Sequence, residues 1–504
     1  MRLSLMAEER TADLIELARA VSGARVEGAE NVQVCGMEFD SRRAMAGNLF
    51  VAVPGFEVDG HEYARAAVDA GAAALVLERE VDGIPADFPR IIVPSSREAM
   101  ALIADAFYEH PSGELALVGV TGTNGKTTTT FLIDAILGAA GRVTGQMGTI
   151  QYRVGSQVIE NPRTTSEAPD LQFYLSQMLE AGASHAVMEV SSHALDLGRV
   201  LGCEFKAAVF TNLTQDHLDF HGDMERYFQA KLRLFTEMAP ENSILNLDDP
   251  WGWKIADEAA IRGAVIGYGM NEKADVRAEG LSISAEGMRF DLVAPEGNVP
   301  VESALTGQHN VSNILAAAAA CLALGLTPAE VAQGIRELKS VPGRFEKVDL
   351  GQPFLVVVDY AHTEDALARI LEFARPVTRG RVLTLMGCGG DRDKSKRPRM
   401  AIAALEGSDR VYMTSDNPRT EAPEAILKEV EAGADQVEGG RARSCTIVDR
   451  REAIQSILAE ARSGDTVVIA GKGHETYQEI GTRRYPFDDR QEAKKSLQSL
   501  GYGN

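Results

Sequence analysis

The segment Gly119–Thr130, with the sequence GVTGTNGKTTTT, constrains the fold of this chain more than any other stretch. An apolar run, Leu115–Val118, precedes it, and a helical pattern that starts at Phe131 follows it. A strand, a glycine-rich loop and a helix in this order are typical of a phosphate-binding loop. The segment therefore predicts an α/β sheet with a nucleoside triphosphate bound where one strand ends.

Each polar residue of this loop has a chemical reason to be there. Gly122 and Gly125 let backbone N–H groups turn inward around an anion. Lys126 adds a positive charge for the outer phosphates, and the Thr127 hydroxyl can ligate magnesium, while the helix N-terminus contributes its dipole. Val120 stands where the common motif has its first glycine, and the alternative interpretation is a glycine-rich turn that binds nothing. The predicted nucleotide contacts are Gly122, Thr123, Asn124, Gly125, Lys126, Thr127 and Thr128.

Length and composition set outer limits on the chain. Its 504 residues are too many for one core and suggest about three or four domains. A net charge of −22 argues against a nucleic-acid partner. The five cysteines are scattered without a CxxC spacing, which fits a reducing cytosol. We expect a cytoplasmic protein without membrane insertion, because no apolar stretch reaches the ~18 residues of a membrane span.

The order of apolar runs predicts three α/β domains, at 1–110, 111–341 and 342–504. The central domain is a doubly wound ATPase domain, and the third domain is a Rossmann-like α/β domain. A polar linker is expected at His110–Gly113, and Val341–Arg344 marks the second boundary. The strands are expected at 49–53, 74–77 and 91–93; at 115–118, 186–190, 207–211, 243–247 and 264–266; and at 354–358, 382–386, 411–413 and 466–470.

Polar clusters follow several of these strands. Glu189 and the segment from Thr211 to His221 supply a carboxylate and imidazoles that can coordinate Mg²⁺, although each residue alone could equally be a hydrogen-bonding residue or a helix cap. Lys231 lies in a helical pattern that gives it no special role. Asn310 and Asn313, one turn apart, could bind a purine edge or cap a helix.

The third region combines groups that suit a zwitterionic amino acid. Arg392 and Arg419 can each bind a carboxylate with a fork of two N–H groups, and Glu475 can accept an ammonium group. Asp416 and Asn417 end one strand of this region, and Gly471 ends another. The alternative for the basic run at 389–397 is a solvated charged segment.

Seven segments taken together resemble the Mur ligase family: TGTNGKTT, EVSSH, TNLTQDHLDFHG, GQHN, DYAH, DNPR and GKGHE. The resemblance runs through all three regions. It implies a cytoplasmic, monomeric, ATP-dependent acid–amino-acid ligase of peptidoglycan synthesis that forms ADP and phosphate. In this reaction meso-diaminopimelate is joined, through an acyl phosphate, to the D-glutamate of UDP-N-acetylmuramoyl-L-Ala-D-Glu.

The resemblance also assigns roles to residues. Lys126, Glu189, His221 and Lys231 match catalytic positions, and Lys231 matches a lysine that carries a carbamate (N6-carboxylysine). Thr127, Glu189, His221 and Lys231 match the Mg²⁺ site. Asn310, Arg344 and Asp359 match nucleotide contacts.

Further matches concern the two other substrates. Phe39, Ser41 and the loop Gly55–Val58 match the uridine-binding part, and Thr164, Thr165, Ser191, Leu197 and Arg199 match positions near the muramoyl peptide. Leu197 departs from the glutamine common in the family, and Glu364 departs from a proline. Arg392, Asp416, Asn417, Pro418, Arg419, Gly471 and Glu475 match the amine pocket, in which Arg419 would bind the distal carboxylate that lysine lacks.

Three other interpretations stay open at this point. A lysine-adding homologue is disfavoured by the tetrapeptide Asp416–Arg419. A folylpolyglutamate synthase is disfavoured by the uridine-type first domain. A nucleotide-binding switch without catalysis is disfavoured because Glu189, His221 and Lys231 are all present.

Overall fold

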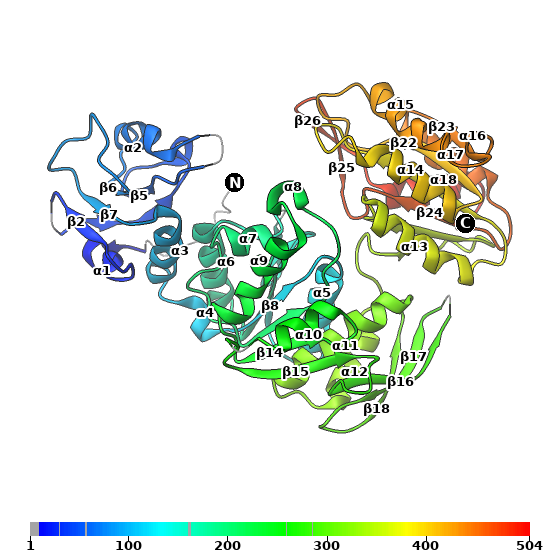
Figure 1. Ribbon diagram of the computed structural model, residues 1–504, viewed down its shortest axis with the longest axis horizontal. Helices are drawn as coiled ribbons and strands as arrows, with labels where there is room; N and C mark the ends of the chain where they lie inside the picture. The colour runs from blue at the N-terminus through cyan, green and yellow to red at the C-terminus, as the bar shows by residue number, and fades with distance from the viewer. Residues whose placement is uncertain are drawn as a thin grey trace. The chain divides into compact units, whose positions relative to one another are not determined.

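The computed structural model describes residues 10–29, 31–55, 58–159, 163–258, 260–284 and 286–503 (Figure 1). Its residue contacts divide the chain into two compact units. The first unit extends to residue 279 and includes 291–299 and 312–335; the second holds 280–290, 300–311 and 336 onward. The domain boundaries expected near residues 110 and 341 stay predictions.

A five-stranded sheet forms the N-terminal part of the first unit, in the order β2-β7-β6-β5-β4. Strands β4 to β7 are parallel to their neighbours, and β2 is antiparallel to β7. The three strands expected here are present within two residues of their predicted ends. The elements are β1 (Ala12–Asp13), α1 (Leu14–Arg19), β2 (Arg25–Glu27), β3 (Gln33–Val34), β4 (Gly36–Glu38), η1 (Ser41–Arg43), β5 (Asn48–Val51), η2 (Gly60–Tyr63), α2 (Ala64–Asp69), β6 (Ala74–Leu77), β7 (Arg90–Ile92) and α3 (Ser96–Phe107).

The central sheet has the strand order β11-β10-β9-β12-β8-β13-β14-β15-β16-β17-β18. The elements up to β15 are α4 (Pro111–Glu114), β8 (Ala116–Thr121), α5 (Lys126–Ala139), β9 (Thr144–Met147), β10 (Tyr152–Val154), β11 (Gln157–Ile159), α6 (Ala168–Glu180), β12 (His185–Glu189), α7 (Ser192–Asp196), β13 (Ala207–Phe210), α8 (Leu218–His221), α9 (Met224–Thr236), β14 (Asn242–Asn246), α10 (Pro250–Ala256) and β15 (Ala264–Gly269). They are followed by β16 (Val276–Ile283), β17 (Met288–Val293), β18 (Val299–Ser303), α11 (Gln308–Ala323) and α12 (Pro328–Glu337).

The connections around β8 create a switch point in this sheet. After β8 the chain runs through α5 to β9, returns to β12 beside β8, and then crosses to β13 on the other side of β8. These strands are all parallel. Ligands of doubly wound sheets bind at the carboxyl ends of the strands where the order reverses. The loop after β8 therefore lies where a ligand site is expected.

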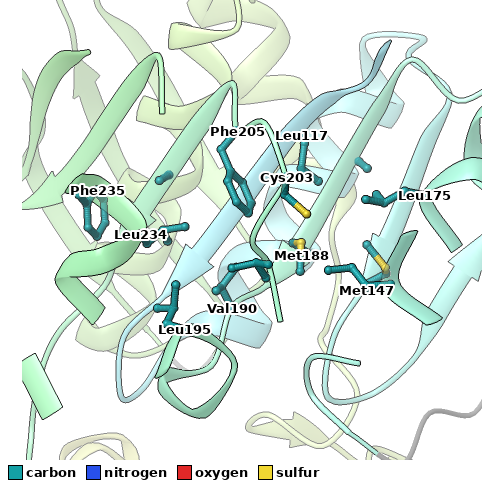
Figure 2. Packing of buried hydrophobic residues seen from close by; sticks show 14 of the residues in the cluster. Leu117, Met147, Leu175, Met188, Val190, Leu195, Cys203, Phe205, Leu234 and Phe235 are labelled. Carbon is teal, nitrogen blue, oxygen red and sulfur yellow. The ribbon is translucent and has the colours of Figure 1, made fainter. Parts of the chain in front are cut away.

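Buried side chains on one face of the central sheet form a hydrophobic core (Figure 2). Leu117 of β8 and Met188 of β12 belong to it, and Phe205 and Cys203 come from the segment that leads to β13. The core fixes the parallel strands side by side, because alternate residues of each strand point to the same face. In this way the carboxyl ends of β8 and β12 are held together.

The structure differs from the sequence expectations in two places. The segment His110–Gly113, expected as a polar linker, instead begins a short helix: α4 starts at Pro111, and Ser112 is buried with its Oγ accepting a hydrogen bond from Glu204 N at 3.0 Å. Strands β9–β11 and β16–β18 had not been expected. Part of β17 carried a readable signal, because Met288, Phe290 and Leu292 are buried and alternate with exposed Arg289 and Asp291.

The second unit contains a six-stranded sheet in the order β19-β20-β24-β21-β22-β23. Its elements are β19 (Glu346–Lys347), β20 (Leu355–Asp359), α13 (Glu364–Val377), β21 (Val382–Cys388), α14 (Lys396–Gly407), β22 (Arg410–Ser415), α15 (Pro423–Ala434), α16 (Gly440–Arg443), β23 (Ser444–Thr446), α17 (Arg450–Glu460), β24 (Thr466–Ala470) and α18 (Asp489–Ser499). A separate hairpin of β25 (Tyr477–Ile480) and β26 (Arg483–Pro486) follows β24.

This sheet has a core on each face. Val357 and Met386 pack with helices α13, α14 and α15, whereas the adjacent Val356 and Leu385 pack with α17 and α18. Strands buried on both faces are continuous apolar runs, which is why all four strands expected here were found in the sequence. The α/β fold class is confirmed in both units. In the described part of the chain, no helix combines the length and apolar content that crossing a membrane requires.

Candidate active site

The phosphate-binding loop has the backbone that its glycines predicted. Gly122 and Gly125 have φ of +143° and +88°, and α5 begins directly after them at Lys126. A Cβ atom at Gly122 would lie 1.9 Å from Thr211 Oγ1, and one at Gly125 would lie 2.3 Å from Asn313 Oδ1. Neither position has room for a side chain. The loop therefore depends on both glycines.

Residues after β13 hold this loop in place. Thr211 Oγ1 and Asn212 Nδ2 donate to Asn124 O at 2.6 and 3.0 Å, and Asn212 Oδ1 accepts from Asn124 N at 2.9 Å. Lys126 Nζ donates to the carbonyls of Gly122 and Thr123, both at 2.8 Å. The sequence suggested metal ligands in the segment after β13, but Thr211 and Asn212 act on the loop itself.

Lys231 of α9 contacts the same loop. Its side chain is buried, and Nζ donates to Gly122 O at 2.9 Å and lies 4.7 Å from the centre of the Tyr227 ring. Burial lowers the pKa of this ammonium group well below its ordinary value, and the positive charge of Lys126 lowers it further. Burial therefore favours the uncharged amine over the ammonium form at this position. The helical pattern of the sequence had given no sign of it.

Glu189, at the end of β12, is fixed by a neighbouring loop. Its carboxylate accepts from Thr149 N at 2.8 Å and from Thr149 Oγ1 at 3.0 Å. Thr164 Oγ1 lies 3.0 Å from Thr149 Oγ1, and Thr165 Oγ1 donates to Glu189 O at 2.9 Å. The loop that holds Thr164 and Thr165 is thus attached directly to the end of β12.

Ser191 and Arg199 extend this group. Thr165 Oγ1 accepts from Ser191 N at 3.1 Å, and Arg199 Nη1 donates to Thr165 O at 3.1 Å. Arg199 Nη2 also pairs with Glu167 at 2.8 Å. The structure therefore gathers Thr164, Thr165, Ser191 and Arg199 beside Glu189. Leu197, the residue after α7, is half-buried, and its N donates to His193 O at 2.9 Å.

His221 lies at the end of α8 in a cluster of rings. Its Nε2 is 2.9 Å from Ser192 Oγ, and its ring stacks on Tyr227 with centroids 4.9 Å apart. Burial is the main reason that the pKa of His221 is lowered. Tyr227 OH in turn lies 3.1 Å from Thr123 Oγ1. Tyr227 thus joins Lys231, His221 and the phosphate loop, a role that the sequence did not suggest.

The donor set here suits Mg²⁺ bound together with phosphate rather than a metal held by protein alone. No group of three His, Cys, Asp or Glu side chains that could hold a metal ion occurs among the described residues. Glu189 supplies a carboxylate and Thr127, in the first turn of α5, a hydroxyl. Mg²⁺ usually takes one or two carboxylates, with water and substrate phosphates completing its octahedron. The residues present fit that pattern.

The expected uridine residues lie near η1. Phe39 packs on the core of the N-terminal sheet, and Ser41 is the first residue of η1, which the Asp40 carboxylate caps through Arg42 N at 3.0 Å. In the loop Gly55–Val58, Gly55 N donates to Val58 O at 2.9 Å. Phe56 and Glu57 of this loop lie outside the described residues.

In the second unit, Asn310 and Asp359 both order backbone turns. Asn310, in the first turn of α11, donates from Nδ2 to Thr306 O at 2.8 Å, which attaches its side chain to the segment before the helix. The Asp359 carboxylate accepts from Phe345 N at 2.7 Å and from Ala361 N at 2.8 Å. The Arg344 guanidinium lies 4.9 Å from the centre of the Tyr360 ring.

Two strand ends of this unit meet around Lys472, a residue that sequence reasoning left unassigned. Asn417 follows β22, while Lys472 and Glu475 follow β24. Lys472 is fully buried, and its Nζ donates to Asn417 Oδ1 and to Glu475 Oε2, both at 2.9 Å. Asn417 Nδ2 donates to the same Glu475 oxygen at 2.8 Å. Gly471, with φ +114°, has no room for a Cβ, which would lie 2.6 Å from Asp416 Oδ2.

Arg419 is fixed by the β25–β26 hairpin. Its φ is +52°, its N donates to Glu479 O at 3.0 Å, and its carbonyl accepts from Gly481 N at 2.7 Å. Its guanidinium donates to Gly390 O at 2.8 Å and lies 3.3 Å from Glu479 Oε2. Pro418 lies beside it, and a Cβ at Gly390 would be 1.9 Å from Pro418 O. Arg392 is exposed in the loop after β21.

Family models match three stretches of the chain. Residues 33–108 match the catalytic domain of the Mur ligase family, 120–321 the Mur ligase middle domain, and 343–473 the Mur ligase glutamate ligase domain. The chain is 46% identical to the UDP-N-acetylmuramoyl-L-alanyl-D-glutamate–2,6-diaminopimelate ligase of Geobacillus kaustophilus, over 97% of this chain and 100% of that protein. The chain belongs to the Mur ligase family.

Other relatives agree with this membership. A Mur ligase of the same name from Solibacter usitatus is 48% identical, over 93% of this chain and 94% of its own. A solved structure of a UDP-N-acetylmuramoyl-L-alanyl-D-glutamate–2,6-diaminopimelate ligase superposes with a TM-score of 0.69 at 34% identity, and covers 98% of this chain and 100% of its own. Mur ligases are ATP-dependent amide ligases, so this chain is an enzyme of that class.

Proposed function

We propose that this Mur ligase joins meso-diaminopimelate to the D-glutamate of UDP-N-acetylmuramoyl-L-Ala-D-Glu in peptidoglycan synthesis. The observation that carries the proposal is identity of 44–48% to ligases of that name along almost the whole chain. The five cysteines are free, in keeping with a cytoplasmic enzyme that uses nucleotide-linked precursors. We infer that it acts there as a monomer and without a nucleic-acid partner.

The reaction has two steps, and ATP drives the first. The γ-phosphoryl group of ATP passes to an oxygen of the D-glutamyl carboxylate, which gives an acyl phosphate and releases ADP. An amine of diaminopimelate then attacks the acyl carbon, a proton leaves the nitrogen, and phosphate departs from the tetrahedral intermediate. Positioning and charge neutralisation lower both barriers.

Lys126 and the backbone amides of the loop would neutralise the negative charge of the ATP phosphates. In the structure Lys126 donates to the carbonyls of Gly122 and Thr123. We infer that the outer phosphates of ATP take these hydrogen bonds over, while the dipole of α5 supports the negative charge. Thr128 also lies in the first turn of α5. We assign Asn310, Arg344 and Asp359 to the nucleotide, as the family resemblance implies.

Lys231, Glu189, His221 and Thr127 would hold Mg²⁺, which supplies further charge neutralisation on the phosphates. A lysine fits this set only after its amine has reacted with CO₂ to form a carbamate anion. Burial lowers the pKa of Lys231 and so favours the amine form, which is the form that reacts with CO₂. A carbamate on Lys231 would also lie near the positive charge of Lys126, because the Nζ atoms of both lysines donate to Gly122 O.

The acceptor peptide would lie along the loop next to β12. The hydrogen bonds that join Thr164, Thr165, Ser191 and Arg199 to the end of β12 support this position. Phe39, Ser41 and the loop Gly55–Val58 would bind the uridine end. The Leu197 side chain cannot donate or accept a hydrogen bond, so the proposed set does not include a side-chain contact of the kind made by a glutamine.

Amine selection would depend on Arg419, with Arg392, Asp416, Asn417, Pro418, Gly471 and Glu475 around it. A held guanidinium favours a ligand with a partner carboxylate and rejects lysine, which lacks one. The test measures amine-dependent phosphate release, and product mass, with ATP, magnesium and the UDP-muramoyl dipeptide. Diaminopimelate should give the tripeptide far faster than lysine. Arg419→Ala should lose diaminopimelate addition and keep ATP binding; equal use of lysine by the wild type would contradict the proposal.

A further inference from the structure

Lys472 lies among more carboxylates than cations, and this excess of negative charge indicates what kind of ligand the cluster would bind. Lys472 Nζ lies 2.9 Å from Glu475 Oε2 and 3.8 Å from Asp416 Oδ1, so one ammonium group is paired with two carboxylates. The other buried cation nearby, Arg450, pairs with Asp489, with Nε and Nη2 at 2.7 and 2.6 Å from its two oxygens, so this second pair is neutral, although the Arg450 charge also helps to lower the pKa of Asp416. Lys472, Asp416 and Glu475 therefore carry one net negative charge. A cationic group on the ligand would complete the cluster.

The hydrogen bonds show where that cation would bind. Glu475 Oε2 accepts from both Lys472 Nζ and Asn417 Nδ2. Glu475 Oε1 accepts no hydrogen bond from any residue that the structure describes, and the side chain keeps 15% of its surface exposed. One oxygen is thus used to orient the carboxylate, and the other is accessible. A buried carboxylate held in this way is prepared to accept hydrogen bonds from an ammonium group.

The contacts of Lys472 are with the pocket and not with the apolar core. Its Nζ contacts residues that follow β22 and residues in its own loop, and it lies 5.7 Å from the centre of the Tyr477 ring. Burying an ammonium group completely is costly unless each of its hydrogen bonds is made. An apolar side chain could fill the same volume without that cost. We therefore attribute the presence of a lysine to the hydrogen bonds that it donates to Asn417 and Glu475.

We propose that Lys472 is a positioning residue of the amine pocket, which orients Glu475 and leaves the pocket one negative charge for an ammonium group of the amine substrate. This inference rests on the proposed function, because it takes the amine to be diaminopimelate. It assigns Lys472 a task distinct from that of Arg419: Lys472 serves the ammonium end of the ligand, and Arg419 serves a carboxylate.

The test is steady-state kinetics of Lys472→Met, with each of the three substrates varied in turn. The KM for diaminopimelate should rise about ten- to a hundredfold, as expected when hydrogen bonds to a charged group are lost. The KM values for ATP and the UDP-muramoyl dipeptide should stay within about twofold, since Lys472 lies outside their proposed sites. Lys495→Met, which removes an exposed lysine paired with Glu492 on α18, is the matched control and should match the wild type.

A second variant covers the case in which Lys472→Met does not fold. Lys472→Met combined with Asp416→Asn removes one charge of each sign and keeps the cluster at one negative charge. It should fold and raise the KM for diaminopimelate beyond that of Asp416→Asn alone, because Glu475 has also lost its orienting hydrogen bond from Lys472. A folded variant with an unchanged amine KM, or an equal rise in all three KM values, overturns the inference and leaves the proposed function intact. Absence of product from the wild type overturns the proposed function and this inference with it.

Discussion

At the scale of single residues, Lys231 places a basic amine in a buried site of the first unit. The amine is buried, shares Gly122 O with Lys126, and stands over Tyr227. We expect Lys231→Ala to lower kcat about a hundredfold or more, because a charged group that stabilises phosphoryl transfer is lost. Formate or acetate should restore part of the activity by occupying the cavity with a carboxylate. Rates measured with and without each acid test this.

Lys206→Ala is the control for this experiment, because Lys206 is an exposed lysine paired with Glu241. It should keep full activity and show no response to added acid. Full activity of Lys231→Ala would contradict the carbamate role.

Residue roles could be predicted from the sequence where the reason was local. Gly122, Gly125 and Lys126 were assigned from their spacing, and the loop backbone agrees with it. Lys231 and Lys472 could not be assigned from spacing, because their burial depends on partners far away in the chain, 109 residues for Gly122 and 55 for Asn417. For Lys231 only the family resemblance supplied a role. For Lys472 nothing in the sequence did.

At the scale of elements, the turn between β8 and α5 leaves little room for side chains at its glycines. Gly125→Ala would place a Cβ 2.3 Å from Asn313 Oδ1 on a backbone with φ of +88°. We expect ATP affinity to fall more than about tenfold, since the loop must move to relieve both strains. Nucleotide titration measures this, and thermal unfolding measures the accompanying loss of stability.

Gly141→Ala is the matched control at the other end of α5. Gly141 has φ of +75°, but its Cβ would meet nothing within 4 Å. This variant should lose about 1 kcal/mol of stability from backbone strain alone and keep the ATP affinity of the wild type. Equal affinities for both variants would show that the loop does not need Gly125.

Elements were predictable where their residues form a continuous apolar run. The strands of the second unit's sheet, such as β20, β21 and β24, are apolar runs between two layers of helices, and their positions were found within three residues. β16 has an exposed and irregular half, and β9 includes a glycine and a glutamine, so neither forms an apolar run. The short helix at Pro111 was hidden by breaker residues, which also occur in the first turn of helices.

At the scale of the whole molecule, the N-terminal sheet and the central sheet share a core. Ala168 and Phe173 of α6 belong to the same buried cluster as Leu17 and Val76 of the N-terminal part. We therefore expect the two sheets to unfold together. Both tryptophans of the chain, Trp251 and Trp253, lie in α10 beside the central sheet, so their fluorescence reports unfolding of the central part only.

Leu17→Ala tests this coupling. The substitution removes a buried side chain from the N-terminal core and should cost about 2–5 kcal/mol. Because the two sheets share that core, the midpoint of the tryptophan transition in urea should fall, although Leu17 lies in α1 and the tryptophans lie in α10. Leu371→Ala, in a core made of second-unit residues alone, is the matched control and should leave that midpoint where it is. An unchanged midpoint for Leu17→Ala would mean that the N-terminal sheet unfolds on its own.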